Sequence, residues 1–435
     1  MVEQIAFIFV LVAAVYIIGK RASRIRKNIQ LGKNIEIKDR PQQRLRNLIL
    51  IAFGQKKMFK RPVPAFLHFF VYVGFLVINI EVLEFIIDGV AGTHRIFSPY
   101  LGSFYTVLMN IFEFLAVAVL ISCIFFLIRR NVLKIRRFWM YEMTQWPRLD
   151  ANIILITEIV LMVAILTMNA TDQILQNVHP HYTATSSLLF SSALIPLFDS
   201  LPLSTLVYIE RFAWWFHIIG ILAFAVYITY SKHLHIFMAF PNTWFAKLEP
   251  KGQMNSMPVV TGEVKMMLGL AEANNVAPSE PGRFGAKDVN DLTWNNLMGA
   301  YACTECGRCT AECPANQTGK KLSPRKIMMD TRDRMEAVGK SLEKGGPGLN
   351  DGKTLLNDYI TKEEINACTS CHACVEACPV MINPLEIIIE LRRYVTMEES
   401  GAPQAWNSMY QNIETNFAPW KFSPGDRFNW AKDEH

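Results

Sequence analysis

The stretch CTECGRCTAECP at residues 303–314 and its counterpart CTSCHACVEACP at residues 368–379 decide the fold of the C-terminal half. Each has the spacing C-x2-C-x2-C-x3-C-P, and together they hold eight of the nine cysteines. A trailing Cys-Pro is typical of [4Fe–4S] ligation in which the fourth cysteine of each motif binds the other cluster. Tetrahedral zinc is the main rival and fits this spacing far less well. The motifs therefore predict two [4Fe–4S] clusters, the first held by Cys303, Cys306, Cys309 and Cys378 and the second by Cys368, Cys371, Cys374 and Cys313.

The spacing between the two motifs predicts a helical domain. Residues 314–367 separate them and contain a helical stretch at 323–343 and a Gly/Pro-rich turn at 345–352. The second motif runs directly into another helical pattern at 385–396. A compact bacterial ferredoxin has a much shorter gap, so we expect an α-helical double-cluster domain over 291–400. His372, inside the second motif, is expected to lie near a cluster or at the surface, because four thiolates are already available.

The N-terminal half has the composition of a membrane domain. The 435 residues are 51% hydrophobic and 19% charged, and the apolar runs lie before about residue 240. This excludes a disordered chain, a disulfide-rich secreted module and a purely soluble enzyme. Five stretches have approximately the length of a membrane span: 4–18, 64–87, 105–128, 151–168 and 212–230. Cys123, the ninth cysteine, lies in the third of them and is assigned to packing.

Loop charge predicts the orientation of these spans. Residues 20–61 carry 14 Lys and Arg, and residues 129–148 carry six more. Residues 89–103 have only Arg95, and residues 170–205 have neither Lys nor Arg. The positive-inside rule then places the N-terminus outside and the cysteine domain in the cytoplasm. The net charge of +6 is explained by lipid headgroups, so no nucleic-acid partner is expected.

The connecting segments follow from the same interpretation. Residues 46–59 alternate basic and apolar side chains, which suits a helix on the inner membrane surface. Residues 188–198 are apolar but too short to span, so we expect them to pack on the outer end of the bundle. The expected domains are 1–240 for the membrane part, 241–290 for a linker on the inner membrane face, 291–400 for the clusters and 401–435 for a tail.

Histidines in the spans point to haem b. His217 and His235 are 18 residues apart, which places them on one stripe of a continuous fifth helix, about 27 Å apart along its axis. His68 enters the second helix at a depth that matches His235. Two imidazoles on facing helices at one depth suit the two axial positions of a haem. The alternative is a histidine that bonds a backbone carbonyl or reaches the membrane interface.

Two segments carry a family resemblance. AFLHFFVYVGFLV at 65–77 and ERFAWWFHIIGILAFAVYITYSKHLHIFMAFPN at 210–242 resemble the five-helix dihaem cytochrome b of the nitrate reductase gamma subunit and of the membrane subunit of heterodisulfide reductase. That family has a second histidine ten residues after the first in the second helix, where this chain has Ile78. His217 therefore lacks the family's partner. The remaining outer candidates are His94, His179 and His181, and we expect His94 to complete a second haem if one is bound.

The cysteine domain also resembles known proteins. YACTECGRCTAECPA at 301–315 and LSPRKIMMDTRD at 322–333 resemble heterodisulfide reductase C-type subunits and, more broadly, succinate dehydrogenase iron–sulfur subunits. Relatives in the heterodisulfide reductase group keep their catalytic site in Cys-Cys-Gly domains or in a flavoprotein. This chain has no Cys-Cys-Gly motif and no G-x-G-x-x-G. The resemblance thus implies a separate cytoplasmic redox subunit as partner.

Carboxylates in the spans suggest a quinone or proton site. Glu81 and Glu113 fall in the outer halves of their helices, where buried carboxylates commonly mark proton or substrate paths. The alternative for each is a carboxylate satisfied by helix packing.

The sequence as a whole predicts a mainly α protein, with a five-span cytochrome b bundle followed by a cytoplasmic helical ferredoxin domain. Its expected role is a bacterial inner-membrane subunit that passes electrons between quinone, haem b and two [4Fe–4S] clusters and a soluble partner. Two alternatives stay open. The spans can be a haem-free anchor and docking plate, or the chain can belong to a proton-coupled redox pump.

Overall fold

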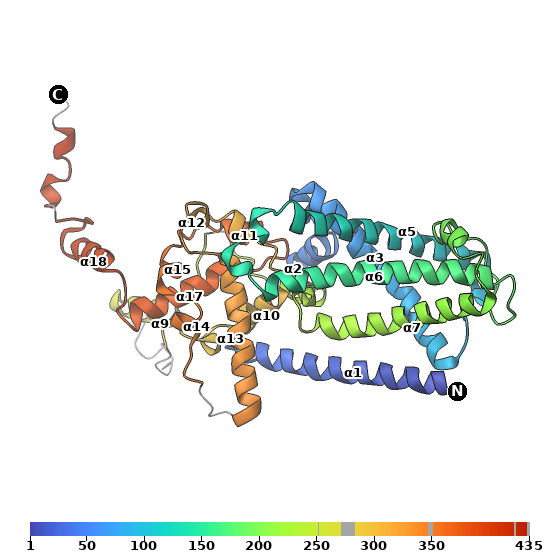
Figure 1. The fold of residues 1–435 in the computed structure, drawn as a ribbon. Coiled ribbons are helices and arrows are strands. Elements are labelled where there is room, and N and C mark those ends of the chain that lie inside the picture. The colour runs from blue at the N-terminus through green and yellow to red at the C-terminus, as the bar shows by residue number, and fades with distance from the viewer. Residues whose placement is uncertain (251, 271–282, 347–350, 422, 433–435) are drawn as a thin grey trace.

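The structure is a computed structural model that describes residues 1–250, 252–270, 283–346, 351–421 and 423–432. Within these residues the chain is helical, with two isolated β-bridges and no strand. A bundle of long helices and a compact region of shorter helices lie end to end (Figure 1). The predicted mainly α fold class is confirmed.

Five helices among the described residues are long and apolar enough to cross a membrane. They are α1 (Val2–Ile29), α3 (Pro62–Ala91), α5 (Ser103–Leu127), α6 (Trp146–Leu175) and α7 (Leu203–Ile228). Helix α6 packs against α5 and α7, α3 packs against α5, and α1 packs against α3 and α7. Each helix extends beyond at least one end of its predicted span, because hydropathy detects only the apolar part whereas backbone hydrogen bonding continues into polar residues.

The first helix approaches α3 closely at one glycine. A Cβ atom on Gly89 would lie 2.7–2.8 Å from the ring atoms of Phe7. Phe7 is buried and also contacts the rings of Trp214 and Trp215 on α7. The absence of a side chain at position 89 thus lets one aromatic ring join three helices.

The fifth span is shorter than predicted at its inner end. Helix α7 ends at Ile228, and α8 (His235–Trp244) begins after a 3₁₀ turn, so His217 and His235 do not share one continuous helix. Asp150 causes the break, because its carboxylate accepts hydrogen bonds from the Tyr227 hydroxyl (2.5 Å), the Ser231 hydroxyl (2.7 Å) and the Lys232 backbone N–H (3.1 Å). The prediction of one stripe 27 Å long was wrong for this reason.

The connecting segments lie at the two ends of the bundle. The expected surface helix is found as α2 (Pro41–Asn47) and the π-helix η1 (Leu48–Phe53), which end before residue 59. The apolar stretch at 188–198 forms η6 (Ser191–Leu197) and packs on α6 as predicted. The other short elements are η2 (Met58–Lys60), α4 (Ser98–Leu101), η3 (Ile128–Val132), η4 (Arg136–Phe138), η5 (Tyr141–Met143) and η7 (Lys232–Leu234).

The cysteine region consists of short helices around two longer ones. The predicted helical stretches are α13 (Pro324–Gly345) and α17 (Pro384–Met397). The remaining elements are α9 (Pro258–Met267), η9 (Val289–Asp291), α10 (Trp294–Ala302), α11 (Arg308–Ala311), α12 (Pro314–Gln317), α14 (Leu355–Asp358), α15 (Lys362–Asn366), α16 (Ala373–Ala377), α18 (Gln404–Asn416), η10 (Pro424–Asp426) and η11 (Asn429–Ala431). Parts of the predicted linker (251, 271–282), turn (347–350) and tail (422, 433–435) lie outside the described residues.

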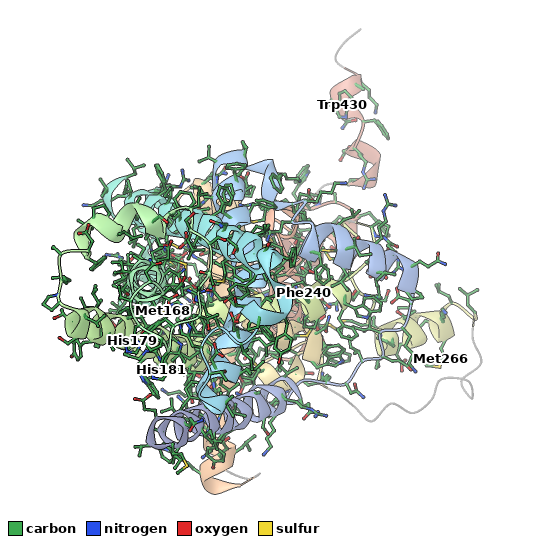
Figure 2. All side chains as sticks on the ribbon, turned by 90° about the vertical axis from the view of Figure 1, so that its right-hand side faces the viewer. Met168, His179, His181, Phe240, Met266 and Trp430 are labelled. Atoms are coloured by element: carbon green, nitrogen blue, oxygen red, sulfur yellow. The ribbon has the colours of Figure 1, made fainter. Side chains whose placement is uncertain are left out.

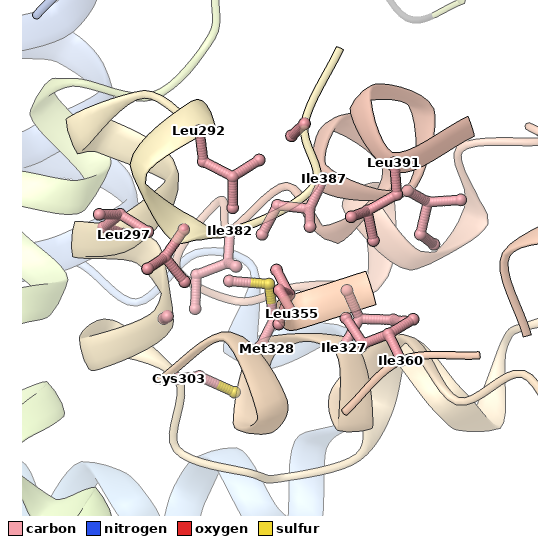
Figure 3. Packing of buried hydrophobic residues seen from close by; sticks show 14 of the residues in the cluster. Leu292, Leu297, Cys303, Ile327, Met328, Leu355, Ile360, Ile382, Ile387 and Leu391 are labelled. Carbon is pink, nitrogen blue, oxygen red and sulfur yellow. The ribbon is translucent and has the colours of Figure 1, made fainter. Parts of the chain in front are cut away.

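The core of this region is apolar and continuous. Leu297, Ile327, Leu355 and Ile387 are fully buried in one cluster of side chains that Cys303 also joins (Figure 3). Burial of such side chains contributes about 1.5–3 kcal/mol each relative to exposure. The cysteine loops are therefore attached to a rigid core.

The cysteine region sits on the end of the bundle that carries the basic loops, here called the inner end; the opposite end is the outer end (Figure 1). Basic side chains of the bundle meet acidic ones of the cysteine region in ion pairs that include Arg21–Glu336, Arg24–Glu343, Lys60–Glu376, Arg61–Glu312 and Lys232–Glu305. Asn28 on α1 donates to the Tyr301 hydroxyl on α10 at 2.8 Å. The charge asymmetry of the sequence thus also holds the two regions together.

Candidate functional site

The first group of cysteines lines one cavity. Cys303, Cys306 and Cys309 come from the first motif and Cys378 from the second, and Arg308 and Arg325 also line the cavity. Burial raises the pKa of Cys303 to about 12 and that of Cys378 to about 11. The Ile382 backbone N–H donates to the Cys378 sulfur at 3.2 Å. Four converging thiols with arginines beside them suit a cofactor that binds thiolates and carries negative charge.

The second group of cysteines lies beside the first. Burial and the neighbouring thiols of Cys368 and Cys371 raise the pKa of Cys313, and burial and Cys368 raise the pKa of Cys374 to about 12. Cys374 also lines the cavity of the first group. Cys313 thus lies near cysteines of the second motif and Cys378 near those of the first, and the assignment of each cysteine to a cluster stays a prediction.

The two groups differ in exposure. Cys371 is exposed, whereas Cys303, Cys374 and Cys378 are buried. The Arg392 guanidinium on α17 holds the loop of the second group by donating to the backbone carbonyls of Ile365 and Cys368. The second group thus reaches the surface through Cys371, while Cys313 and Cys374 of the same group are buried.

Glu305 joins the first cysteine loop to the bundle, and sequence reasoning missed it. Its carboxylate pairs with the Lys232 ammonium at 2.5 Å and with the Arg332 guanidinium at 2.9 Å. Burial raises the pKa of Glu305, but the two cations outweigh burial and leave it lowered. Lys232 lies in the turn that Asp150 stabilises. The sequence feature that could have indicated this role is the presence of an acidic residue inside a cysteine motif.

His68 and His235 meet at the inner end. His68 on α3 lies within electrostatic range of both His235 and Arg308. Its Nδ1 lies 3.1 Å from the Gln55 amide oxygen, and Nδ1 of His235 lies 3.1 Å from the Lys232 carbonyl oxygen. In the described part of the chain, Nε2 of neither ring has a hydrogen-bond partner. A ring with Nδ1 held and Nε2 unused is the arrangement of a metal-ligating histidine.

His233 is a third histidine near the inner pair. Its ring lies 5.4 Å from that of His235 and 5.6 Å from that of Phe224, between centroids. Because α7 ends at Ile228, the direction of this ring does not follow from a continuous fifth helix. The structure places His233 beside the pair rather than on the far side of the helix.

The outer histidines are not brought together. Nδ1 of His217 lies 3.0 Å from the Leu161 carbonyl, and its ring contacts that of Phe85. His94 uses both ring nitrogens, Nε2 toward Asp172 (3.0 Å) and Nδ1 as acceptor from the Thr183 N–H (3.1 Å). Leu161 and Asp172 are separated by about 16 Å along α6.

One haem iron needs both axial nitrogens about 2 Å away, a bond length typical of metal–imidazole sites. The arrangement therefore does not support the expectation that His94 pairs with His217. His179 and His181 lie together in the outer loop, where the His181 N–H donates to Nδ1 of His179 (Figure 2).

The two predicted carboxylates differ in their partners. Glu113 accepts hydrogen bonds from the backbone N–H groups of Phe190 (2.9 Å) and Ser191 (3.2 Å) and from the Asn169 amide (3.2 Å). Glu81 is 4% exposed, and its Oε1 is buried without a hydrogen-bond partner among the described residues. Glu113 thus anchors an outer loop, and Glu81 remains available for chemistry.

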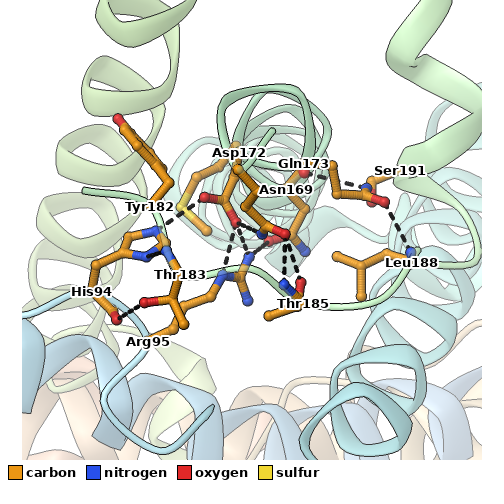
Figure 4. Close-up of polar contacts among 12 residues, drawn as sticks. His94, Arg95, Asn169, Asp172, Gln173, Tyr182, Thr183, Thr185, Leu188 and Ser191 are labelled. Atoms are coloured by element: carbon orange, nitrogen blue, oxygen red, sulfur yellow. Dashed lines mark hydrogen bonds and ion pairs between the residues drawn. The ribbon is translucent and has the colours of Figure 1, made fainter. Parts of the chain in front are cut away.

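A buried polar network fills the outer end, and sequence reasoning missed its centre (Figure 4). The Arg95 guanidinium donates to Asp172 (2.8 Å), to the Asn169 amide oxygen (3.1 Å) and to the Tyr105 hydroxyl (3.2 Å). The Tyr105 hydroxyl in turn donates to Glu84 at 2.8 Å. This network could have been predicted from the sequence, because Arg95 is a single basic residue in an outer loop beside several membrane carboxylates.

Comparisons with known proteins support the cysteine assignment. Residues 302–382 match the family of 4Fe-4S dicluster domains. The C-type subunit of the ferredoxin/F(420)H(2)-dependent CoB-CoM heterodisulfide reductase of Methanosarcina acetivorans is 33% identical over 104 residues, which cover 24% of this chain and 50% of that protein. The predicted resemblance to this type of protein is confirmed.

Two longer relatives extend the similarity over the membrane part. The probable iron-sulfur-binding oxidoreductase FadF of Bacillus subtilis is 28% identical over 461 residues, covering 99% of this chain and 61% of that protein. The EtfAB:quinone oxidoreductase of Syntrophomonas wolfei is 26% identical over 421 residues, covering 91% of this chain and 55% of that protein. No solved structure gives a significant match. The chain spans little more than half of these relatives, and it is a membrane protein with an iron–sulfur domain, similar to iron–sulfur oxidoreductases.

Proposed function

We propose that this chain is the membrane subunit of a quinone-linked oxidoreductase, passing electrons between the quinone pool, haem b, two [4Fe–4S] clusters and a soluble redox partner. The observation that carries the proposal is the position of Arg308. It lines the cavity of the first cysteine group, and its guanidinium donates to the Lys57 carbonyl (3.4 Å), two residues after Gln55, whose amide oxygen lies 3.1 Å from His68. The histidine pair and the first cysteine group are thereby neighbours at the inner end.

The cysteines would hold the two clusters in the sets that their motifs imply. Cys303, Cys306, Cys309 and Cys378 would bind the first, and Cys313, Cys368, Cys371 and Cys374 the second. The clusters and the haem supply one-electron chemistry when bound. Arg308 and Arg325 would balance the negative charge of thiolate ligands in the first cavity. The Ile382 N–H would hydrogen-bond the Cys378 sulfur, an interaction that tunes cluster potentials.

His68 and His235 would bind one haem b through Nε2. Gln55 and the Lys232 carbonyl fix the orientation of the two rings through Nδ1. His217 would serve as a ligand only if a partner other than His94 reached it. The proposal therefore has one haem, near the inner end.

Glu81 is the candidate for proton exchange with quinol. It lies within electrostatic range of Glu84, Glu113 and Arg95 and keeps one carboxylate oxygen unpaired among the described residues. A buried carboxylate of this kind in a span is a functional candidate. Glu113 is left out, because Phe190, Ser191 and Asn169 already use its oxygens. The same residue supports the second candidate function, a proton-coupled redox pump.

The proposed location is the bacterial inner membrane, with the N-terminus outside and the cysteine region in the cytoplasm. It rests on the basic loops of the inner end. The catalytic site for the soluble substrate would lie on another chain that carries Cys-Cys-Gly domains or a flavin, because the cysteine region is similar to one subunit of a heterodisulfide reductase.

The test is the iron and haem content of the purified full chain, followed by quinol-driven reduction in a reduced-minus-oxidised spectrum. About eight irons and one haem per chain, all reducible by menaquinol or ubiquinol, are the expected result. Cys378→Ser, with a matched Cys123→Ser control outside the motifs, should lower iron content while the control should not. A chain that contains iron but no haem would support the alternative in which the membrane helices are a haem-free anchor. Haem and clusters that quinol cannot reduce would overturn the quinone linkage.

A further inference from the structure

We propose that Lys232 and Glu305 are positioning residues that couple the haem ligand His235 to the loop of the first cluster. Their ion pair ties the turn that orients His235 to the loop between Cys303 and Cys306. The inference rests on the proposed function, in which His235 binds haem b and the two cysteines bind the first cluster. It assigns a role to two buried charged groups that bind neither cofactor.

Glu305 is an acidic residue at a place where the cysteine motif does not require one. It stands between Cys303 and Cys306 in a left-handed backbone conformation (φ 56°), which non-glycine residues adopt rarely. Ser370 stands at the corresponding place of the second motif with the same conformation (φ 55°), and its hydroxyl accepts a hydrogen bond from Arg392 within the cysteine region. The turn therefore forms without a carboxylate, and the carboxylate is an addition to the first motif.

The Glu305 carboxylate reaches out of the cysteine region into the inner end of the bundle. One of its oxygens lies 2.5 Å from the Lys232 ammonium, and the other lies 2.9 Å from the Arg332 guanidinium. Lys232 and Glu305 are 8% and 3% exposed, so water does not replace either partner. Separating such a pair leaves a buried charge uncompensated, and the pair therefore holds the loop and the turn in one relative position.

The backbone of Lys232 holds the imidazole of His235. The Lys232 carbonyl oxygen lies 3.1 Å from Nδ1 of His235, and the Lys232 N–H donates to the Asp150 carboxylate at 3.1 Å. The ammonium of the same residue also donates to the Pro147 carbonyl at 2.5 Å. A hydrogen bond at Nδ1 sets the orientation and the basicity of a ligating imidazole. Lys232 thus orients the histidine through its backbone while its side chain contacts the cluster loop.

The same cysteine loop also contacts the support of the other inner histidine. Arg308, two residues after Cys306, donates to the Lys57 carbonyl at 3.4 Å. Gln55, two residues before Lys57, has its amide oxygen 3.1 Å from Nδ1 of His68. Residues on both sides of Cys306 therefore contact the groups that orient the two histidines. A displacement of this loop changes the orientation of the axial ligands as well as the position of the first cluster.

The experiment measures the haem of the purified full chain by EPR spectroscopy and redox titration. In Glu305→Gln we expect the g values of the oxidised haem and its midpoint potential to shift, because the change in the cluster loop reaches the His235 ring through Lys232. The double variant Lys232→Met/Glu305→Gln should shift both values as well. It removes the ion pair but keeps the net charge, so its shift reports position rather than charge.

The matched control is Glu343→Gln. Glu343 on α13 pairs with Arg24 on α1 and joins the same two regions, but neither residue belongs to the turn or to a cysteine motif, so both haem values should stay unchanged.

The double variant keeps the test decisive if Glu305→Gln does not fold, because it leaves no buried ammonium without its partner. Unchanged g values and potential in the double variant at full haem content, or equal shifts in Glu343→Gln, would overturn the positioning role. A wild-type chain without haem would reject the proposed function and this inference together. Haem that quinol cannot reduce would reject only the quinone linkage.

Discussion

The two ends of the membrane bundle both contain buried charged groups and histidines, but they use them differently. At the outer end, both ring nitrogens of His94 have partners, Asp172 and the Thr183 N–H. The Arg95 guanidinium there donates to Asp172, Asn169 and Tyr105. At the inner end, His68 and His235 each keep Nε2 without a partner among the described residues. His94 and Arg95 at the outer end thus hold loops in place, whereas His68 and His235 at the inner end each keep a ring nitrogen for a ligand.

The comparison shows that residue type in a span does not decide between structure and function. Buried polar groups are normally satisfied by hydrogen bonds, so a group with unused capacity indicates a site. By this criterion the inner histidines, His217 and Glu81 are functional candidates, whereas His94 and Glu113 are structural. The following experiments test that division, beginning with the largest expected effect.

Loss of either inner histidine should abolish haem binding. In His68→Ala and His235→Ala the reduced-minus-oxidised spectrum of the purified chain should show no haem b, because one axial ligand is removed. His94→Ala should keep the full haem content per chain. A chain that loses haem on substitution of His94 would place a haem ligand at the outer end and break the comparison.

Asp172→Asn should be the most destabilising change at the outer end. It leaves Arg95 buried with its principal charge partner removed, and breaking a buried ion pair typically costs about 3–5 kcal/mol. The expected result is a clear fall in the thermal unfolding midpoint in detergent, with haem content per folded chain unchanged. The matched Asp199→Asn, in the loop after η6, should have little effect. Equal midpoints for the two variants would contradict the structural role.

Glu113→Gln and Glu81→Gln should separate the two membrane carboxylates. Glu113→Gln disturbs the acceptor of two backbone N–H groups and should cost about 1–3 kcal/mol of stability. Glu81→Gln removes the exchangeable proton of a buried carboxyl group that has an unpaired oxygen, so stability should be retained while quinol oxidation slows. The measurements are thermal unfolding and quinol-driven reduction. Slow turnover only in the Glu113 variant would reverse the assignment.

The contact between α1 and the cysteine region should stay intact at mildly acidic pH and weaken only at lower pH. Burial raises the pKa of Glu336. Hydrogen bonds from Arg21 and Tyr301 lower this pKa by more than burial raises it, so the net shift is downward. A carboxylate with a lowered pKa stabilises the folded state above its unfolded value of about 4.5, and this contribution is lost as pH falls through the folded pKa.

Stability should therefore differ between the wild type and Glu336→Gln by about 1 kcal/mol from pH 8 to pH 5.5 and converge below. Denaturant titrations across this range measure the difference. A difference that shrinks between pH 8 and pH 6 would contradict the direction of the shift.

The sequence predicted the parts of the molecule that depend on local pattern. The cysteine spacing predicted two groups with exchanged fourth members; Cys378 lines one cavity with Cys303, Cys306 and Cys309, and the cluster ligands stay a prediction. Hydropathy located all five membrane helices. These features were predictable because motif spacing and apolar length act within short stretches of chain.

The features that the sequence did not predict depend on contacts between distant residues. The break after α7 is caused by Asp150, which lies 77 residues before Tyr227 and on another helix. The partners of His94 come from α6 and from the outer loop, so its spacing to His217 carried no information about them. Whether a polar residue in a span is free or satisfied is set by such contacts, which a single sequence does not reveal.

The attachment of α1 to the cysteine region has a consequence for the order in which the molecule assembles. Arg21 pairs with Glu336 across 315 residues of sequence, and Asn28 donates to Tyr301 across 273. Chains are synthesised from the N-terminus, so α1 enters the membrane long before its partners exist. The inner part of α1 must wait until the cysteine region has folded, and this step closes a loop of 315 residues. Formation of the cysteine region is therefore expected to be the event that completes the membrane bundle.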